Sequence, residues 1–322
     1  MNNETALYNK TTKLAKITAI VSVALAAVIA LAYFFALRFD FDYSIGHFER
    51  GSALFYTLAG AIIVAVATPA LLFVFAKKKS SITSIPKATG APVFISVFAA
   101  VMAAAACISE ILTVTSQRAP AKLAIIAAVG LIAIVFGMIS LSSEKIYTSV
   151  SAQIALPLAA LAMAVRILDA YFDQTLVLNS PVRYITMLAE LSVMFLLLSE
   201  SRLTFGLYKT ERGDTARKAT LPFYLFANNV CASLAIGFST GALLHGLIPG
   251  GTHAVTATHP SYFRLALYLT VGALALTRAL TVQKITGEYI PSPFENKKKD
   301  SENEDPAENE ENEENQSEKD LI

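Results

Sequence analysis

Long runs of apolar residues, separated by short polar segments, dominate the pattern of this chain. Eight runs reach the roughly 20 residues that a helix needs to cross a hydrocarbon core of about 30 Å. They lie at residues 17–37, 52–76, 92–115, 121–142, 148–172, 182–203, 221–246 and 263–284. None alternates between apolar and polar residues with period two, which excludes a transmembrane β-barrel. The pattern predicts an all-α, polytopic transmembrane bundle of eight helices.

Polar segments at the two ends divide the chain into three predicted regions. Residues 1–16 form an N-terminal segment, residues 17–290 the transmembrane domain, and residues 291–322 a tail rich in glutamate and asparagine. The tail has almost nothing apolar to bury, so we expect it to be disordered. The first run follows several lysines, as in a signal peptide, but its length of about 20 residues predicts an uncleaved helix.

The distribution of lysine and arginine sets the expected orientation. With the N-terminus inside, inner segments hold 18 of these residues and outer segments hold six. Cytoplasmic loops retain basic residues, so both termini are predicted to be cytoplasmic, in a multi-pass protein of the cell membrane. The net charge of +1 conceals a division into +9 for residues 1–294 and −8 for residues 295–322. The acidic tail is either a solvated extension or a docking segment for a cytoplasmic protein.

Composition agrees with a membrane protein and adds few chemical motifs. Hydrophobic residues make up 54% of the chain and charged residues 16%, with mean hydropathy +0.53, which excludes a soluble domain. No zinc-protease, P-loop or nucleophile-elbow motif occurs, so no enzymatic activity, cofactor or nucleic-acid partner is expected. Tryptophan is absent, and the expected interfacial belt consists of tyrosines: Tyr33, Tyr56, Tyr147, Tyr171, Tyr184, Tyr224 and Tyr262.

Cysteines and histidines give no prediction of a metal site. Cys107 and Cys231 both lie inside apolar runs, where neither a disulfide framework nor a cysteine-based metal site is expected. His245, His253 and His259 are close in sequence, but their spacing matches no zinc motif and the segment between them contains no acidic residue. His245 is predicted to be an ordinary loop residue at the end of its run.

Ionisable residues within the runs are the main candidates for function, because such groups are costly in a membrane. An outer set consists of Glu110, Arg166, Asp169 and Glu190. Glu190 lies about 12 Å inside its run, too deep for a carboxylate to reach water easily. One arginine against three carboxylates leaves an excess of acid, which favours a protonatable site. Alternatively, Arg166 pairs with Glu190 or Glu110 only to hold helices together.

A second set of polar residues lies nearer the inner side. Glu200 and Arg278 are expected to form a structural ion pair, with an inner gate as the alternative. The seventh run carries a stripe of small and polar residues from Asn229 to Gly241, which favours close helix packing. Alternatively, the adjacent amides of Asn228 and Asn229 line a transport path.

Two classes of function agree with these residues. The first is a small-solute or ion permease, in which the outer set forms a protonatable site. The second is a non-transporting scaffold or sensor, in which the charged residues pair structurally and the tail and basic inner loops recruit a cytoplasmic partner. Both classes require the lipid bilayer as the principal partner.

Overall fold

Long helices account for nearly all of the part of the chain that the computed structural model describes, which is residues 2–75, 90–114, 121–147, 149–172, 180–211, 221–248 and 261–282. The helices are α1 (Asn2–Phe35), α2 (Ala53–Phe75), α3 (Ala91–Val114), α4 (Ala121–Ser140), α5 (Glu144–Tyr147), α6 (Val150–Phe172), α7 (Pro181–Glu211), α8 (Leu221–Leu247) and α10 (Tyr262–Val282). A π-helical turn, η1 (Ala36–Asp40), continues α1 into the strands β1 (Phe41–Asp42) and β2 (His47–Phe48). The predicted disordered tail, His253 and His259 lie outside the described residues.

Eight of the described helices are long and apolar enough to cross a membrane, which confirms the predicted all-α architecture and the number of spans. They cover residues 16–40, 53–71, 91–113, 122–140, 150–172, 181–205, 222–247 and 262–280. Large apolar side chains on their outer faces are mostly exposed, such as Ile63 at 68%, Phe94 at 73% and Leu112 at 71%. Such exposure suits contact with acyl chains, and the chain is therefore a multi-pass membrane protein.

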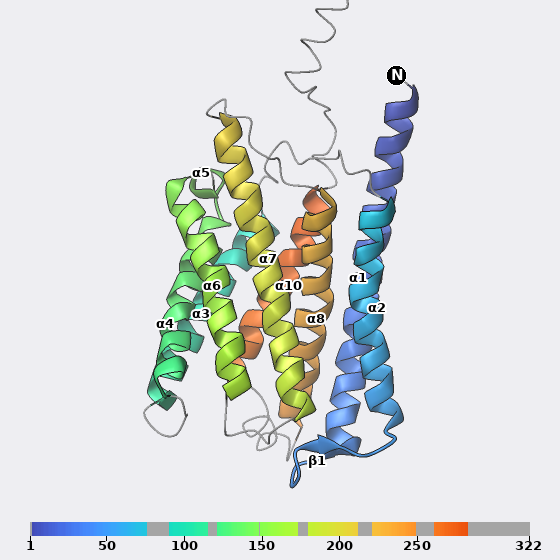
Figure 1. The fold of residues 1–322 in the computed structure, drawn as a ribbon, viewed down its shortest axis with the longest axis vertical. Helices are drawn as coiled ribbons and strands as arrows, with labels where there is room; N and C mark the ends of the chain where they lie inside the picture. Colours follow the sequence, from blue (N-terminus) through green and yellow to red (C-terminus); the bar gives the residue numbers. More distant parts are fainter. Residues whose placement is uncertain are drawn as a thin grey trace, which may run out of the picture. The chain divides into compact units, whose positions relative to one another are not determined.

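The two ends of the bundle can be told apart by what they carry (Figure 1). The start of α1 and the end of α10 lie at one end, which we call the terminal side. The hairpin of β1 and β2 lies at the other end, which we call the hairpin side. The cytoplasmic location of the termini remains a prediction from the charge distribution.

Helix α8 occupies the centre of the packing, in contact with α1, α2, α7 and α10. Its small residues let α1 approach closely. A methyl group added at Gly237 would lie 2.7 Å from the Ile29 side chain, and one added at Gly241 would lie 2.7 Å from the carbonyl oxygen of Ala30. The Ser22 hydroxyl donates a hydrogen bond to the Asn229 side chain across the same interface, at 3.2 Å. The stripe on α8 therefore supports close packing, as its small residues predict.

Helices α3, α4, α6 and α10 pack through small residues as well. The side of α3 within the bundle carries buried alanines, including Ala99 and Ala103, and α3 contacts both α4 and α10. On α4, a methyl group added at Gly130 would lie 3.0 Å from the Cβ atom of Ala162 on α6. Close backbones allow long polar side chains from separate helices to meet between them.

The hairpin-side connection between α1 and α2 has a defined structure that hydropathy did not predict. Phe41 pairs with Phe48 in the antiparallel ladder, and Gly46 takes the positive φ of 71° that its turn requires. Ser44 donates its backbone N–H and its hydroxyl to Asp42, and the hydroxyl bond is the main reason why the Asp42 pKa is lowered. The Ser180 hydroxyl donates to the Gly46 carbonyl at 2.8 Å, which ties the hairpin to the start of α7.

The predicted tyrosine belt is correct only in part. Four of its members are 39 to 64% exposed at the ends of spans, as expected: Tyr56, Tyr171, Tyr184 and Tyr262. The prediction is wrong for the other three, which are only 1% exposed: Tyr33, Tyr147 and Tyr224. A buried phenol needs a polar partner for its hydroxyl, and two of these three find one in a carboxylate described below.

Candidate functional site

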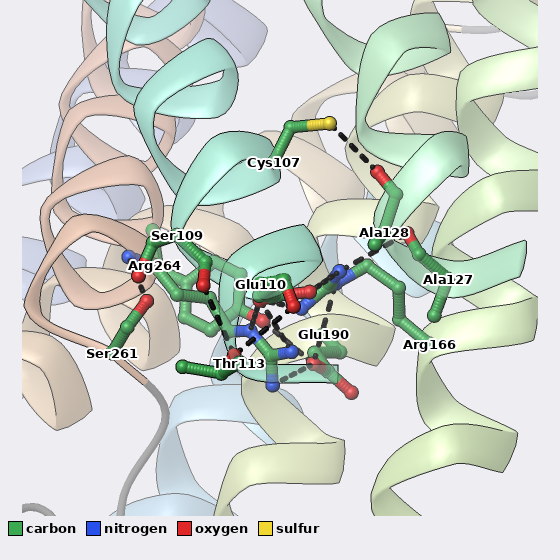
Figure 2. Close-up of polar contacts among 11 residues, drawn as sticks. Cys107, Ser109, Glu110, Thr113, Ala127, Ala128, Arg166, Glu190, Ser261 and Arg264 are labelled. Carbon is green, nitrogen blue, oxygen red and sulfur yellow. Dashed lines mark hydrogen bonds and ion pairs between the residues drawn. The ribbon is translucent and has the colours of Figure 1, made fainter. Parts of the chain in front are cut away.

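Four long polar side chains meet near the hairpin side, one from each of four helices (Figure 2). Glu110 comes from α3, Arg166 from α6, Glu190 from α7 and Arg264 from α10. All four are at most 4% exposed. Together with Tyr268 of α10, which contacts Glu190, they form what we call the hairpin-side network. Three of the four predicted outer residues thus come together in space.

Glu110 is the most fully paired member of this network. Arg166 donates to both of its oxygens, with NH2 at 2.9 Å from Oε1 and NH1 at 3.0 Å from Oε2. Arg264 approaches Oε1 from the other side, and its Nε donates at 2.7 Å. Both carboxylate oxygens therefore accept charge-assisted hydrogen bonds, and the Arg166 pair has the two-pronged geometry that favours arginine over lysine.

Glu190 is held more loosely, although it is fully buried. The Tyr268 hydroxyl donates to Oε1 at 2.6 Å. The two arginines are farther from this oxygen, with Arg166 Nε at 3.8 Å and Arg264 NH1 at 3.7 Å. Oε2 has no hydrogen-bond partner among the described residues. One network therefore contains a tightly bound carboxylate and one with a free oxygen.

The expected excess of acid is wrong. Arg264, one of the six basic residues counted with the outer segments, lies in the first turn of the eighth span and contributes a second positive charge. Across the described residues, four arginines and four carboxylates are buried: Arg166, Arg183, Arg264, Arg278, Glu110, Asp169, Glu190 and Glu200. Asp169 lies one turn along α6 from Arg166. The balance follows from the cost of a net charge in a low dielectric, which neutral combinations avoid.

A second group, which we call the terminal-side network, surrounds Glu200 of α7. The Tyr147 hydroxyl donates to Oε2 at 2.6 Å, and the Tyr224 hydroxyl donates to Oε1 at 2.8 Å. Arg278 Nε lies 3.1 Å from Oε1, and its guanidinium carbon is 5.1 Å from the centre of the Tyr147 ring. Burial raises the Tyr147 pKa well above its usual range, which keeps this phenol a donor. Glu200 and Arg278 thus meet, and both Glu200 oxygens have partners.

The two asparagines of α8 are fully buried and differ in their contacts. Asn229 accepts from Ser22 and donates to the Leu225 carbonyl, so both ends of its amide are engaged. Asn228 donates to the Tyr224 carbonyl, and its Oδ1 has no hydrogen-bond partner among the described residues. Asn229 thus contributes to the α1–α8 contact, whereas the role of Asn228 in a path remains a prediction.

His245 is not the loop residue expected from its position. It lies in the last turn of α8 and is 2% exposed. Its Nε2 is 2.9 Å from the hydroxyl of Tyr43 in the hairpin, and the two rings stack. Burial raises the Tyr43 pKa to about 12, so this hydroxyl stays protonated and donates to the Leu37 carbonyl at 2.9 Å. Within the described residues, no three His, Cys, Asp or Glu side chains gather to hold a metal.

Four members of the two networks were not predicted from the sequence: Tyr147, Tyr224, Arg264 and Tyr268. Arg264 and Tyr268 are four residues apart, a spacing that places both on one face of α10, and this spacing was the available signal. Considered singly, an arginine near the end of a span is indistinguishable from one that extends toward the surface. The tyrosines were equally ambiguous, because a phenol suits both an interface and a buried carboxylate.

The hairpin-side network has no net charge when both of its carboxylates are ionised. One carboxylate oxygen, Glu190 Oε2, has no hydrogen-bond partner among the described residues. Protonation of Glu190 would remove its attraction to Arg166 and Arg264, and would change the forces between α6, α7 and α10. Glu110 would keep both of its arginine contacts. Comparison of the chain with protein-family models, curated proteins and solved structures finds no match.

Proposed function

We propose that this multi-pass membrane protein is a permease for protons or a small solute, and that Glu190 is the group that takes up and releases the proton. The observation that carries this proposal is the unequal pairing of Glu110 and Glu190 within one network. A carboxylate kept only to hold helices together would have partners on both oxygens, because an unpaired buried oxygen costs about 1–3 kcal/mol. Glu110 meets this expectation and Glu190 does not.

The charge balance supports a coupling role for the same residue. With both carboxylates ionised, Glu110 and Glu190 neutralise Arg166 and Arg264. A proton on Glu190 leaves one positive charge in excess and frees Glu190 from both arginines. Since these side chains belong to four different helices, the protonated and ionised forms favour different helix positions. A carrier needs such a link between proton binding and conformation.

The alternative is the non-transporting scaffold, and one observation favours it. The network is enclosed, and the cavity beside it, lined by Tyr268, offers only about 10 Å³. That space admits nothing larger than a water molecule. A solute would therefore reach Glu190 only after the helices move, and a scaffold needs no such movement.

Transport by reconstituted protein separates the two functions. Purified full-length protein in liposomes containing a pH-sensitive dye should carry protons under an imposed membrane potential, and Glu190→Gln should reduce this flux to the level of protein-free liposomes. The same liposomes would then be tested for uptake of amino acids, sugars and dicarboxylates with and without a pH gradient. Glutamine has nearly the same shape and still accepts from Tyr268, so the fold should persist.

Glu200→Gln is the matched control, since it makes the same chemical change in a carboxylate with partners on both oxygens. We expect it to lower thermal stability and to leave proton flux near the wild-type level. If Glu190→Gln matches the wild type in flux and solute uptake while its thermal stability falls, Glu190 is a structural residue and the scaffold is supported.

A further inference from the structure

A small, partly open cavity lies between α1, α7, α8 and α10, and it adjoins the hairpin-side network at Tyr268. Tyr268, which donates to Glu190, forms part of its wall. The remaining polar lining comes from Tyr33 on α1, Thr186 on α7 and Ser239 on α8. Apolar side chains from α7, α8 and α10 complete the wall. The cavity and the network therefore share one residue, Tyr268.

Ser239 provides the main evidence that the cavity holds a small polar molecule. Its side chain is completely buried, and its hydroxyl has no hydrogen-bond partner among the described residues. The other buried serines of α8 and α7 differ, because Ser233, Ser192 and Ser199 donate to carbonyls of their own helices. A buried hydroxyl without a partner is costly, so a small polar molecule at this position would be stabilising.

The size and lining of the cavity match a single water molecule. Its volume of about 10 Å³ is near the lower limit of the space that admits one water molecule. Buried waters usually make two to four hydrogen bonds. Ser239 offers a donor and acceptors, the Thr186 hydroxyl donates to Val182 and keeps its acceptor capacity, and the Tyr268 hydroxyl likewise keeps its acceptor capacity. An organic solute or a hydrated ion would not fit.

We infer that this cavity binds one ordered water molecule, and that the water and Tyr268 form the route by which protons reach Glu190. The second part rests on the proposed function. In the relay, an incoming proton adds to the water, the water passes a proton to the hydroxyl oxygen of Tyr268, and Tyr268 passes its own hydroxyl proton to Glu190. The water and Tyr268 each gain one proton and lose one, Glu190 gains one, and no bond between heavy atoms changes.

Ser239→Ala tests the inference by removing one partner of the water without filling the cavity. A map of the full-length wild type, at a resolution that shows ordered water, should contain one water density between Ser239 and Tyr268, and this density should be lost or weakened in Ser239→Ala. Proton flux in liposomes should fall several-fold. Ser233→Ala is the matched control, because it removes a serine hydroxyl that already bonds to its own helix, and its flux should equal that of the wild type.

The outcomes separate the water, the relay and the permease. A cavity without water density in the wild type overturns the water site. Water density with unchanged flux in Ser239→Ala overturns the relay, and Glu190→Gln then decides the permease independently. If wild-type protein carries no protons, the relay fails with the proposed function while the map still decides the water site. Should Ser239→Ala fail to assemble, Thr186→Val removes a second partner of the water at nearly constant volume, with the same expected results.

Discussion

The hairpin-side and terminal-side networks are built on the same two helices but differ in how completely they are paired. In each, α7 supplies a carboxylate and α10 an arginine: Glu190 with Arg264, and Glu200 with Arg278. The nitrogen–oxygen distance is 3.7 Å in the first pair and 3.1 Å in the second. Two phenols donate to Glu200, one on each oxygen, whereas one phenol donates to Glu190.

This difference shows that burial alone does not distinguish the two carboxylates. Glu190 and Glu200 are both 0% exposed, so exposure cannot separate them. What separates them is the number of donors for each oxygen. A carboxylate oxygen that already accepts a hydrogen bond is engaged, whereas an oxygen without a partner keeps its full acceptor capacity.

The largest effect is expected when the hairpin-side network loses a cation. Arg166→Met removes the two-pronged contact to Glu110 and the long-range contact to Glu190, and leaves two buried carboxylates facing one arginine. We expect the free energy of unfolding to fall by about 3–5 kcal/mol, measured by reversible unfolding in detergent. Adding Glu110→Gln to this variant should recover part of the loss. A double variant that loses the sum of both single effects would contradict direct pairing.

The same substitution on the terminal side should cost less. Arg278→Met removes the cation beside Glu200, but the hydroxyls of Tyr147 and Tyr224 still donate to both of its oxygens. A loss of about 2–3 kcal/mol is expected, measured as for Arg166→Met. Equal losses of stability for Arg166→Met and Arg278→Met would show that the hydroxyls of Tyr147 and Tyr224 do not compensate for the missing cation. The more complete pairing of Glu200 would then have no energetic consequence.

The fold was largely predictable from sequence, because the thickness of the bilayer dictates the length of each span. All eight predicted runs agree with the described spans to within five residues at each boundary. The hairpin after η1 and the short helix α5 were not predicted, since two-residue strands and a single helical turn leave no periodicity to detect. The small residues of α8 did predict close helix packing, although not that its partner would be α1.

The candidate site was only half predictable, for a physical reason. Glu110, Arg166 and Glu190 stood out because a charge in the middle of an apolar run is costly and rare. Arg264 is two residues from the start of its helix, where an arginine is ordinary, and apart from its spacing from Tyr268 no sequence feature indicated that it is buried, at 4% exposure, within the network. Which donors reach which oxygen depends on side-chain geometry across four helices, and no sequence pattern contains that information.

Removing a single tyrosine hydroxyl should lower stability less than removing an arginine, and it tests one hydrogen bond in each network. Tyr268→Phe and Tyr147→Phe each remove a hydrogen bond of 2.6 Å to a buried carboxylate and leave the aromatic ring in place. Each should lower the free energy of unfolding by about 1.5–3 kcal/mol, the range for hydrogen bonds to charged groups. Tyr268→Phe should also reduce proton flux, because the phenol lies on the inferred route, and Tyr147→Phe should not. A flux that falls equally in both variants would place the effect on the fold instead.

The smallest expected effect is the coupling between the two networks. Glu190 and Glu200 are ten residues apart on α7, or about 15 Å along the helix axis, and the helix between them carries buried apolar residues such as Val193 and Leu197. The stability losses of Tyr268→Phe and Tyr147→Phe should therefore add in the double variant to within about 0.3–0.5 kcal/mol. Unfolding of the four proteins of this cycle in one detergent measures the coupling directly. A coupling energy well above that range would mean that the networks respond to each other through α7, and the terminal-side network would then belong to the transport mechanism and not only to the structure.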